Sequence, residues 1–328
     1  MLNGLAGKFE ELFIFQEQQV FYFHLYPVFH QTVFRKIFIK VLHLLAVASV
    51  NGGDRSKSCQ FHDYVLKNQV FLYLCPAKIT QLEKIRVGIV NYLNTRPLIY
   101  GLQRPPINKK IELVGDYPAR LADMLLNNKI DLGLIPVAVI PKLPSSYIIS
   151  DYCIGTEGEI ASVALFSEVP MGEVKKIYLD YQSRTSVALL KYLVKEYWGI
   201  NPEFAEAADE DYREEIKGTT AGLVIGDRAF EQRKISTFIY DLGSEWKKIT
   251  GLPFVFAAWI STKKLPNDFI NDFNAANALG LQHIDEIVAA NPFELYDLKK
   301  YYTLHLSYRL DNDKRKGMKK FLEIAKDL

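Results

Sequence analysis

The sequence predicts an α/β protein built as two lobes that are joined by two hinge crossings. Short β-rich runs alternate with helical segments from residue 85 onward, and this order favours parallel strands with right-handed crossovers. Two longer apolar runs, residues 162–167 and 254–260, bracket a second set of alternating segments and are expected to carry the chain between the lobes. A length of 328 residues is enough for about two domains.

The overall composition excludes several classes of protein. Hydrophobic residues make up 49% of the chain and charged residues 24%, which is ordinary for a globular protein. A net charge of +2 creates no strong field toward nucleic acid or an anionic membrane, so we expect neither partner. The 3 cysteines show no zinc-ligand spacing, and nucleotide, metalloprotease and serine-hydrolase motifs are absent. We therefore expect neither a metal nor a cofactor.

Residues 1–84 differ in composition from the rest of the chain. They contain ten of the 20 Phe but only two of the 14 Pro, and their aromatic residues follow no sustained period of 2 or 3.6. The apolar run at residues 37–50 lies far from Met1 for a signal peptide and is too short to span a membrane. We interpret residues 1–84 as an N-terminal extension outside the fold, included by an early start codon, and we expect a cytoplasmic protein.

Lobe I is expected to comprise residues 85–167 together with residues 257–328. In its first part, strands are predicted at residues 85–90, 111–114 and 130–135, with helices at residues 97–102 and 118–127. Ligands of such sheets bind beyond the carboxyl ends of the parallel strands. The loop at residues 91–96 and the turn at Pro136 are therefore expected at one functional edge.

Lobe II is expected to comprise residues 168–256. Its strands are predicted at residues 176–180, 221–225 and 238–242, and a polar loop leads from the first of these into a helix with Val187, Leu190 and Val194 on one face. After the second crossing the chain returns to lobe I as helices, predicted at residues 268–290, 293–302 and 314–325.

Six sequence blocks, in the same order, carry a resemblance to a known family. They are VGIVNYLNTRPL at residues 87–98, DLGLIP at 131–136, SVALFS at 162–167, SRTS at 183–186, IGD at 225–227, and a stretch from YDLG at 240–243 through Trp246 to TGLPFVFA at 250–257. The ordered set resembles the chorismate dehydratase family of menaquinone biosynthesis. The resemblance covers the chain from about residue 84 to the C-terminus.

The resemblance implies a type II periplasmic-binding-protein fold that has become an enzyme. Members of this family remove water from chorismate to give 3-[(1-carboxyvinyl)oxy]benzoate, in the futalosine route to menaquinone. The family's active-site asparagine falls on Asn94 and its active-site serine on Ser162, so these two are the expected catalytic residues. The implied partner is a small molecule, chorismate, and we expect a monomer or a homodimer.

The chemistry of chorismate points to the polar loop that follows a strand of lobe II and opens a helix. Chorismate carries two carboxylates, and the free backbone N–H groups and dipole of a helix start attract anions. Ser183, Thr185 and Ser186 are therefore predicted to bind the substrate. One of their hydroxyls is equally suited to cap the helix, and the two roles are compatible.

Arg184 and Asp227 are the charged candidates for substrate binding. Arg184 has the chemistry to clamp a carboxylate through two parallel hydrogen bonds, and its alternative is a structural ion pair with Asp180 or Asp227. Asp227 follows a strand and Gly226, so it either faces the cleft or caps the next helix. Asn94 also has an alternative role, as the residue that stabilises a turn.

The sequence offers no obvious proton acceptor for the reaction. His283 and His305, the histidines after residue 84, fall in the C-terminal segments, and the matched blocks offer Asp227 as the candidate acid. The C3 proton of chorismate is acidified through the conjugated diene and the ring carboxylate, which favours a stepwise, proton-first elimination. We therefore favour a substrate-assisted route, in which the enolpyruvyl carboxylate takes the proton and the protein fixes the geometry.

Two alternatives remain open at the level of the sequence. A solute-binding protein of the same fold would normally carry an export signal or a lipid-attachment cysteine, and residues 1–84 offer neither in a convincing form. The related dihydroxynaphthoate-forming enzyme of the same pathway has a different opening motif, and a histidine is expected in its cleft.

Overall fold

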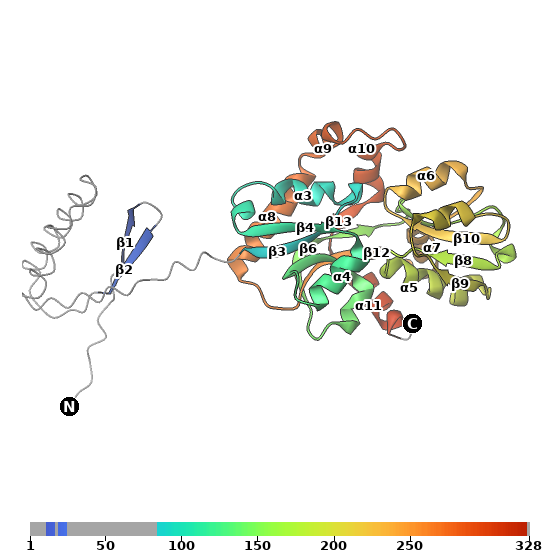
Figure 1. Cartoon of the computed structure of the whole chain (residues 1–328), viewed down its shortest axis with the longest axis horizontal. Helices are drawn as coiled ribbons and strands as arrows, with labels where there is room; N and C mark the ends of the chain where they lie inside the picture. The colour runs from blue at the N-terminus through green and yellow to red at the C-terminus, as the bar shows by residue number, and fades with distance from the viewer. Residues whose placement is uncertain (1–10, 17–18, 25–83, 327–328) are drawn as a thin grey trace, which may run out of the picture. The chain divides into compact units, whose positions relative to one another are not determined.

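The computed structural model describes residues 11–16, 19–24 and 84–326 of the chain (Figure 1). It divides into two compact units, Met1–Glu83 and Lys84–Leu328. Among the described residues, no helix combines the length and the apolar character that crossing a membrane requires.

The first unit contains a β-hairpin that the sequence analysis did not anticipate. Strands β1 (Glu11–Gln16) and β2 (Gln19–His24) pair in antiparallel register. Residues 1–84 were interpreted as an extension outside the fold and no strand was predicted there, but both runs are rich in aromatic and branched residues, which favour strands. The remainder of the expected extension, up to Glu83, lies outside the described residues.

Lobe I of the second unit is built on a six-stranded sheet. Its strands, in spatial order, are β13 (Ser307–Arg309), β6 (Tyr147–Thr156), β12 (Phe254–Ser261), β5 (Leu132–Pro136), β3 (Ile85–Val90) and β4 (Ile111–Asp116). Strands β3, β4 and β5 run parallel, as the alternating pattern predicts, whereas β12 lies antiparallel between β5 and β6. Every residue of β5 and β12 is buried, which accounts for their uninterrupted apolar sequences.

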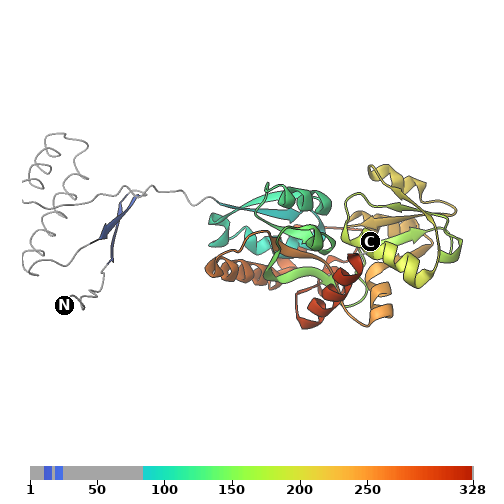
Figure 2. The same ribbon diagram turned by 90° about the horizontal axis from the view of Figure 1, so that it is seen from below.

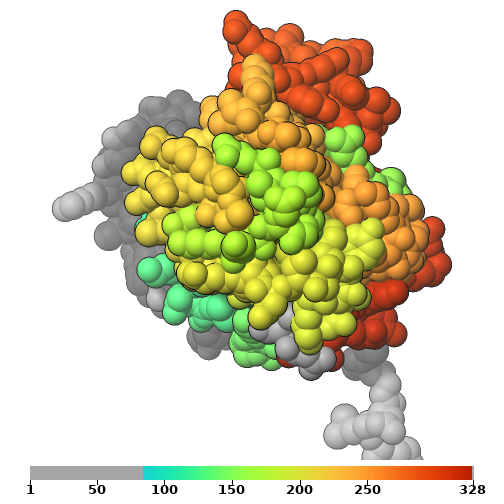
Figure 3. Space-filling model, turned by 90° about the vertical axis from the view of Figure 1, so that its right-hand side faces the viewer, coloured from blue at the N-terminus to red at the C-terminus, as the bar shows by residue number. Residues whose placement is uncertain are grey.

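Lobe II is built on a five-stranded sheet. Its strands, in spatial order, are β11 (Phe238–Asp241), β7 (Val163–Ser167), β10 (Thr220–Ile225), β8 (Lys176–Leu179) and β9 (Glu203–Glu206). Strands β8, β9 and β10 are parallel, and β7 runs antiparallel to both of its neighbours. Figure 3 views the molecule from the side of this lobe, whose yellow-green and yellow surface covers most of that face.

The two crossings between the lobes do not coincide with the two apolar runs that were expected to form them. Strand β7 pairs within the sheet of lobe II, and β12 pairs within the sheet of lobe I, so neither apolar run bridges the lobes. The crossings are instead residues 157–162 and residues 251–253. The expected lobe limits at 167 and 257 therefore differ from the observed ones, because a strand that is buried on both faces belongs to the core of one sheet.

Helices cover the faces of both sheets. In lobe I they are α3 (Arg96–Leu102), α4 (Pro118–Leu126), α8 (Asn267–Leu281), α9 (Ile284–Ala290), α10 (Leu298–Lys300) and α11 (Asn312–Ala325). In lobe II they are α5 (Thr185–Tyr192), α6 (Arg228–Ile235) and α7 (Leu242–Thr250). Two π-helical turns follow α5 and α10, at Leu193–Trp198 and Tyr301–His305. Short 3-10 turns complete the connections, at Leu93–Thr95, Ile107–Lys109, Val137–Lys142, Met171–Glu173 and Glu210–Glu215.

The C-terminal segment joins the two lobes. Figure 2 shows α11 at the junction between them, where it packs on lobe I and also contacts α5 of lobe II. Before α11, the ring of Tyr301 lies edge-on to the ring of Phe230 in α6, with 5.0 Å between the centroids. Aromatic pairs of this geometry contribute about 1 kcal/mol beyond their buried area. Tyr301 and α11 therefore stabilise the arrangement of the two lobes.

A close approach of two helices fixes the start of α3, which borders the site. A Cβ atom at Gly101 in α3 would lie 1.8 Å from the carbonyl oxygen of Ala276 in α8, and one at Gly280 would lie 1.7 Å from that of Pro97. No side chain fits at either position, so the two glycines let α3 and α8 pack backbone to backbone. The loop that precedes α3 is consequently held against the body of lobe I.

Candidate functional site

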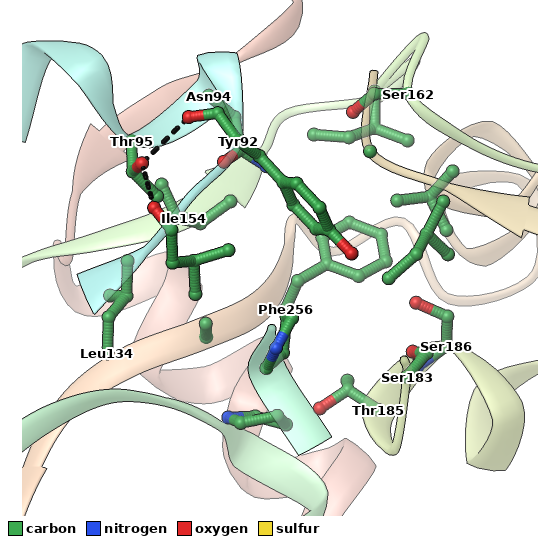
Figure 4. A pocket seen from close by; sticks show the side chains of 18 residues that line it. Tyr92, Asn94, Thr95, Leu134, Ile154, Ser162, Ser183, Thr185, Ser186 and Phe256 are labelled. Atoms are coloured by element: carbon green, nitrogen blue, oxygen red, sulfur yellow. Dashed lines mark hydrogen bonds between the residues drawn. The ribbon is translucent and has the colours of Figure 1, made fainter. Parts of the chain in front are cut away.

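A pocket lies between the lobes, at the carboxyl ends of β3, β5 and β10 (Figure 4). The empty space among its lining residues, part of which is open to solvent, measures about 510 Å³. The lining residues are Val90, Tyr92, Asn94, Thr95, Pro118, Leu134, Pro136, Ile154, Ile160, Ser162, Val163, Ser183, Thr185, Ser186, Ile225, Gly226, Phe256 and Ala257. The loop after β3 and the turn at Pro136 thus share one edge, as the parallel order predicts.

The loop after β3 supplies the wall of the pocket that belongs to lobe I. The hydroxyl of Thr95 donates to the carbonyl oxygens of Val90, at 2.6 Å, and Tyr92, at 2.8 Å, and so closes the turn. Asn94 was given an alternative role as the residue that stabilises this turn, but Thr95 has that role instead. The side-chain oxygen Oδ1 of Asn94 is buried and has no hydrogen-bond partner. A buried acceptor without a partner is costly, so this atom is suited to a ligand that brings a donor.

Ser162 stands at the end of the first crossing, on a strained turn. Its backbone nitrogen donates to the carbonyl oxygen of Ile160 at 2.8 Å, and Ala161 between them has a φ of 65°. This is a γ-turn in the left-handed region, where a residue with a Cβ atom is strained. The side chain of Ser162 is fully buried and accepts a hydrogen bond from the hydroxyl of Tyr301 at 2.6 Å.

An acid and an arginine of lobe II hold this strained turn in place. The carboxylate of Asp241 accepts hydrogen bonds from the backbone nitrogens of Ile160, at 3.1 Å, and Ala161, at 2.9 Å. Arg233 donates to the carbonyl oxygen of Ala161 at 2.6 Å and forms a 3.1 Å ion pair with Asp241. Burial raises the pKa of Asp241, while these backbone N–H groups and Arg233 oppose the rise. The position of Ser162 is therefore set by groups that lie outside the pocket.

The start of α5 forms the opposite wall and brings together three predicted residues, Ser183, Thr185 and Ser186. The hydroxyl of Ser183 accepts a hydrogen bond from the backbone nitrogen of Ser186 at 3.1 Å, so Ser183 caps the helix. The hydroxyl of Thr185 accepts one from the backbone nitrogen of Ala138 in lobe I, at 3.2 Å. Capping and pocket lining occur together, as the sequence analysis allowed.

Arg184 does not line the pocket. Its side chain is 53% exposed, and its guanidinium lies 4.0 Å from the carboxylate of Asp123 on the surface. Neither expected ion pair forms, because Asp180 is buried and bonds at 2.8 Å to Arg228 instead. Asp180 also accepts from the backbone nitrogen of Ile225 at 3.0 Å, so it supports the pocket wall from behind. Arg184 was predicted to bind the substrate, and the exposed position of its side chain argues against that role.

Asp227 also lies outside the lining of the pocket. Its carboxylate accepts hydrogen bonds from the backbone nitrogen of Leu93 in lobe I, at 3.0 and 3.2 Å, and makes no capping bond to α6. Burial raises the pKa of Asp227 to about 6, opposed by the bond from Leu93 and the charges of Arg96 and Arg228. Of the two predicted roles, contact with the cleft and capping, the structure shows neither. It shows a link between the lobes.

Further contacts across the cleft hold the lobes together. The hydroxyl of Tyr92 donates to the side-chain oxygen of Gln182, and the backbone oxygen of Gln182 accepts from the nitrogen of Ala119 at 3.1 Å. In Figure 4 the ring of Tyr92 lies between Asn94 and the serines at the start of α5. Gly226, with a φ of 69°, makes room for this ring, since a Cβ atom there would lie 3.0 Å from it. These contacts join the two lobes beside the pocket.

The lining of the pocket carries little formal charge. Among the described residues that line it, Tyr92 is the one with an ionisable side chain, and burial raises its pKa further above the ordinary value. An anionic ligand would consequently be held by hydroxyls, by backbone N–H groups and by the start of α5. Because these donors are neutral, their affinity for an anion depends on how many hydrogen bonds they form and on how well these bonds are aligned.

Three tyrosines of the site were missed by the sequence analysis. Tyr92 lies within the opening block but was not singled out, and neither Tyr301 nor Tyr308 was a candidate site residue. Tyr301 bonds to Ser162, and the hydroxyl of Tyr308 donates to the backbone oxygen of Asn94 at 2.9 Å. The density of tyrosine between residues 296 and 308 was the available signal, because a buried tyrosine usually needs a hydrogen-bond partner.

Most of this chain matches the model of a known protein family. A family model described as "Menaquinone biosynthesis" matches residues 85–327, which is most of the chain. The chain belongs to the menaquinone biosynthesis family. The family match begins one residue after the start of the second compact unit, at Lys84.

A curated relative and several solved structures resemble this member of the menaquinone biosynthesis family. A protein of Thermus thermophilus named chorismate dehydratase is 27% identical over 260 residues, covering 72% of this chain and 93% of the relative. A crystal structure of an Archaeoglobus fulgidus protein aligns with a TM-score of 0.62 and 17% identity, covering 74% of this chain and 97% of that protein.

Two further structures define the fold. A Candida albicans protein, described as having the generic periplasmic binding protein fold, aligns with a TM-score of 0.52 and 16% identity, over 75% of this chain and 91% of that one. An alkanesulfonate-binding protein of Xanthomonas axonopodis aligns with a TM-score of 0.53 and 14% identity, over 74% of this chain and 92% of that one. The fold is therefore periplasmic-binding-protein-like, as the resemblance implied.

Proposed function

We propose that this protein is a chorismate dehydratase, a hydro-lyase that converts chorismate to 3-[(1-carboxyvinyl)oxy]benzoate in the futalosine route. The observation that carries the proposal is the pairing of Asn94 and Ser162 in one pocket between the lobes, where Asn94 Oδ1 is buried without a partner. Membership of the menaquinone biosynthesis family and the Thermus thermophilus relative support the same reaction.

The single hydrogen-bond donor of chorismate is a suitable partner for the unpartnered oxygen of Asn94. As a dianion, chorismate carries many acceptor oxygens but one O–H donor, the C4 hydroxyl, which is the group that leaves. Asn94 Oδ1 accepts a hydrogen bond from that hydroxyl in the proposed complex and so fixes the face of the ring. The hydroxyl of Ser162 accepts from Tyr301, and its own hydrogen is free to donate to the reacting carboxylate.

The elimination requires one bond to break at each of two neighbouring ring carbons. The C3–H proton moves to the enolpyruvyl carboxylate of the substrate, and the electron pair is delocalised through the diene toward the ring carboxylate. The C4–O bond then breaks, the ring becomes aromatic, and the proton leaves with the oxygen as water. The protein contributes orientation and fixed hydrogen-bond donors, which supply most of the rate enhancement in reactions of this type.

The position of Asp227 supports the substrate as its own base. A general base must come within hydrogen-bond reach of the proton that it removes. The carboxylate of Asp227 is instead bonded to the backbone of Leu93 and lies outside the pocket lining. The serines of α5 are left to bind the ring carboxylate, which keeps the reacting carboxylate free to take the proton.

The alternative enzyme of the same pathway is disfavoured by the placement of the histidines. Neither His283 nor His305, the histidines of the described segment 84–326, lines the pocket. His305 bonds to the hydroxyl of Tyr296 at 2.9 Å and lies 3.6 Å from Glu159. A solute-binding protein of this fold remains the other candidate, and turnover distinguishes it. A cytoplasmic location and a monomer or homodimer stay predictions.

The direct test is turnover of chorismate by the purified protein. Incubation should produce an aromatic compound that has lost one water, identified by ultraviolet absorption and mass spectrometry, and its rate should scale with protein concentration. Asn94→Ala serves as the matched control and should abolish most of the turnover. Tight binding of chorismate without conversion would support the solute-binding alternative, and absence of both would contradict the proposal.

A further inference from the structure

Two tyrosines of the C-terminal segment reach the two proposed catalytic residues from outside the pocket. The hydroxyl of Tyr301 lies 2.6 Å from Oγ of Ser162, and the hydroxyl of Tyr308 lies 2.9 Å from the backbone oxygen of Asn94. The Tyr301 side chain is fully buried, and Tyr308 is 5% exposed. Neither tyrosine lines the pocket, so they contact the site residues rather than the substrate.

The hydrogen bond from Tyr301 decides what Ser162 offers to a ligand. A serine hydroxyl has one hydrogen and two acceptor lone pairs. Because Tyr301 donates to Oγ, the hydrogen of Ser162 remains available for the pocket, and rotation of the hydroxyl is restricted. Without Tyr301 the same hydroxyl is free to adopt other rotamers, in which its hydrogen points away from the substrate.

The loop that carries Asn94 is held by the second tyrosine. The hydroxyl of Tyr308 donates to the backbone oxygen of Asn94 at 2.9 Å and so fixes the main chain from which this side chain projects. The side-chain oxygen Oδ1 of Asn94 is buried without a hydrogen-bond partner, which leaves it for a ligand that brings a donor. Asn94 is thereby presented as an acceptor and Ser162 as a donor.

The surroundings of Tyr301 make it a rigid support. Its ring packs edge-on to Phe230 with centroids 5.0 Å apart and also approaches Tyr296 at 6.3 Å. It opens the π-helical turn Tyr301–His305, and π-helical turns are often found at functional sites. These ring contacts need only a phenyl group, so packing alone does not explain a hydroxyl at this position.

We propose that Tyr301 and Tyr308 are positioning residues. Tyr301 sets Ser162 as a hydrogen-bond donor toward the substrate, and Tyr308 holds the backbone of Asn94, whose side-chain oxygen is the acceptor. This inference rests on the proposed dehydration of chorismate. It assigns the C-terminal segment a role in orienting the reaction, in addition to its packing against both lobes.

The test compares Tyr301→Phe and Tyr308→Phe with the matched control Tyr296→Phe, in the full-length protein with chorismate as substrate. Each of the first two variants should lower kcat by about 10- to 100-fold with KM changed by less than about 3-fold, since orientation acts on the transition state. Tyr296→Phe, which removes a hydroxyl from the same aromatic cluster, should leave kcat unchanged. Thermal unfolding of every variant shows whether the fold is intact.

A double-mutant cycle separates positioning from packing. In a Ser162→Ala protein, Tyr301→Phe should lower the residual kcat by less than about 2-fold, because the hydroxyl that it orients is already gone. Equal losses of kcat in both backgrounds, or a wild-type kcat in Tyr301→Phe, would overturn the assignment of Tyr301. Should Tyr301→Phe fail to fold, Tyr308→Phe with wild-type kcat overturns the proposal and with reduced kcat supports it. A wild-type protein that does not convert chorismate overturns both the proposed function and this inference, whereas an active one confines failure to the tyrosines.

Discussion

The carboxylate of Asp227 in lobe II lies 3.0 Å from the backbone nitrogen of Leu93 in lobe I. This contact fastens the lobes next to the pocket, one residue before Asn94. A buried carboxylate in that position has a structural use that requires no contact with the substrate. The contact therefore favours a link between the lobes over the role of general base, which the sequence had left open for Asp227.

Asp227→Asn should retain most of the catalytic rate. The amide oxygen of asparagine still accepts from Leu93, so we expect kcat to fall by less than about 10-fold. A general base converted to an amide would lose about 10²–10⁴-fold. Steady-state kinetics with chorismate makes the comparison, and Asp227→Ala, which removes the acceptor, should be the more damaging change. A loss in the larger range with normal folding would show that the substrate-assisted route is wrong.

The same carboxylate should give the stability a distinctive pH dependence. Burial raises the pKa of Asp227 from 3.8 to about 6, so the folded state holds this proton more tightly than the unfolded state. The free energy of unfolding should therefore decrease as the pH rises from about 4 to about 6, by at most about 3 kcal/mol. Urea unfolding of the wild type and Asp227→Asn at several pH values isolates the effect. Identical pH profiles would contradict this electrostatic account.

Asn94 and Ser162 should differ kinetically from the start of α5. Asn94→Ala and Ser162→Ala remove groups that orient the reacting atoms, and both should lower kcat more than they raise KM. Thr185→Ala removes one hydroxyl among several anion donors and should chiefly raise KM. Arg184→Ala is the matched control, because this side chain is exposed and should leave both constants within about 2-fold. A strong rise of KM in Arg184→Ala would return that residue to the substrate site.

The unit that begins at Lys84 should fold and turn over chorismate without residues 1–81. The compact unit and the family match both start at this point, at Lys84 and residue 85. We expect a chain shortened to begin at Leu82 to show the thermal unfolding temperature and kcat of the full-length protein. Loss of soluble protein or of turnover would assign the preceding residues to the fold.

Ligand binding should shift the lobes toward the closed arrangement. The bonds of Tyr92 to Gln182 and of Leu93 to Asp227 span the cleft, so substrate entry requires them to open. Small-angle scattering of the shortened chain should give a smaller radius of gyration when 3-[(1-carboxyvinyl)oxy]benzoate is added at saturation. The same measurement on Asp227→Ala should show a more open ligand-free state. A radius of gyration that does not respond to ligand would indicate a rigid pocket.

Local pattern was sufficient to predict most strands and the edge of the sheet that carries the site. Alternation of β-rich and helical segments predicts parallel strands, and parallel strands bring the loop after β3 and Pro136 to one edge. The limits of the lobes were harder to predict from the sequence, because an apolar run has the same pattern whether it bridges two sheets or lies inside one. Strand pairing decided that β7 belongs to lobe II and β12 to lobe I.

The sequence by itself determined the chemical inventory of this protein: an asparagine and a serine in recognisable blocks, a hydroxyl-rich helix start, and no nucleotide or zinc-binding motif. Only the tertiary structure decided which polar groups meet. Ser162 and Tyr301 are separated by 139 residues and lie 2.6 Å apart, and Arg184 lies beside pocket residues yet points to the surface. Neighbours in sequence share a backbone, but the direction of a side chain and its partners from distant segments follow from packing, which no local pattern encodes.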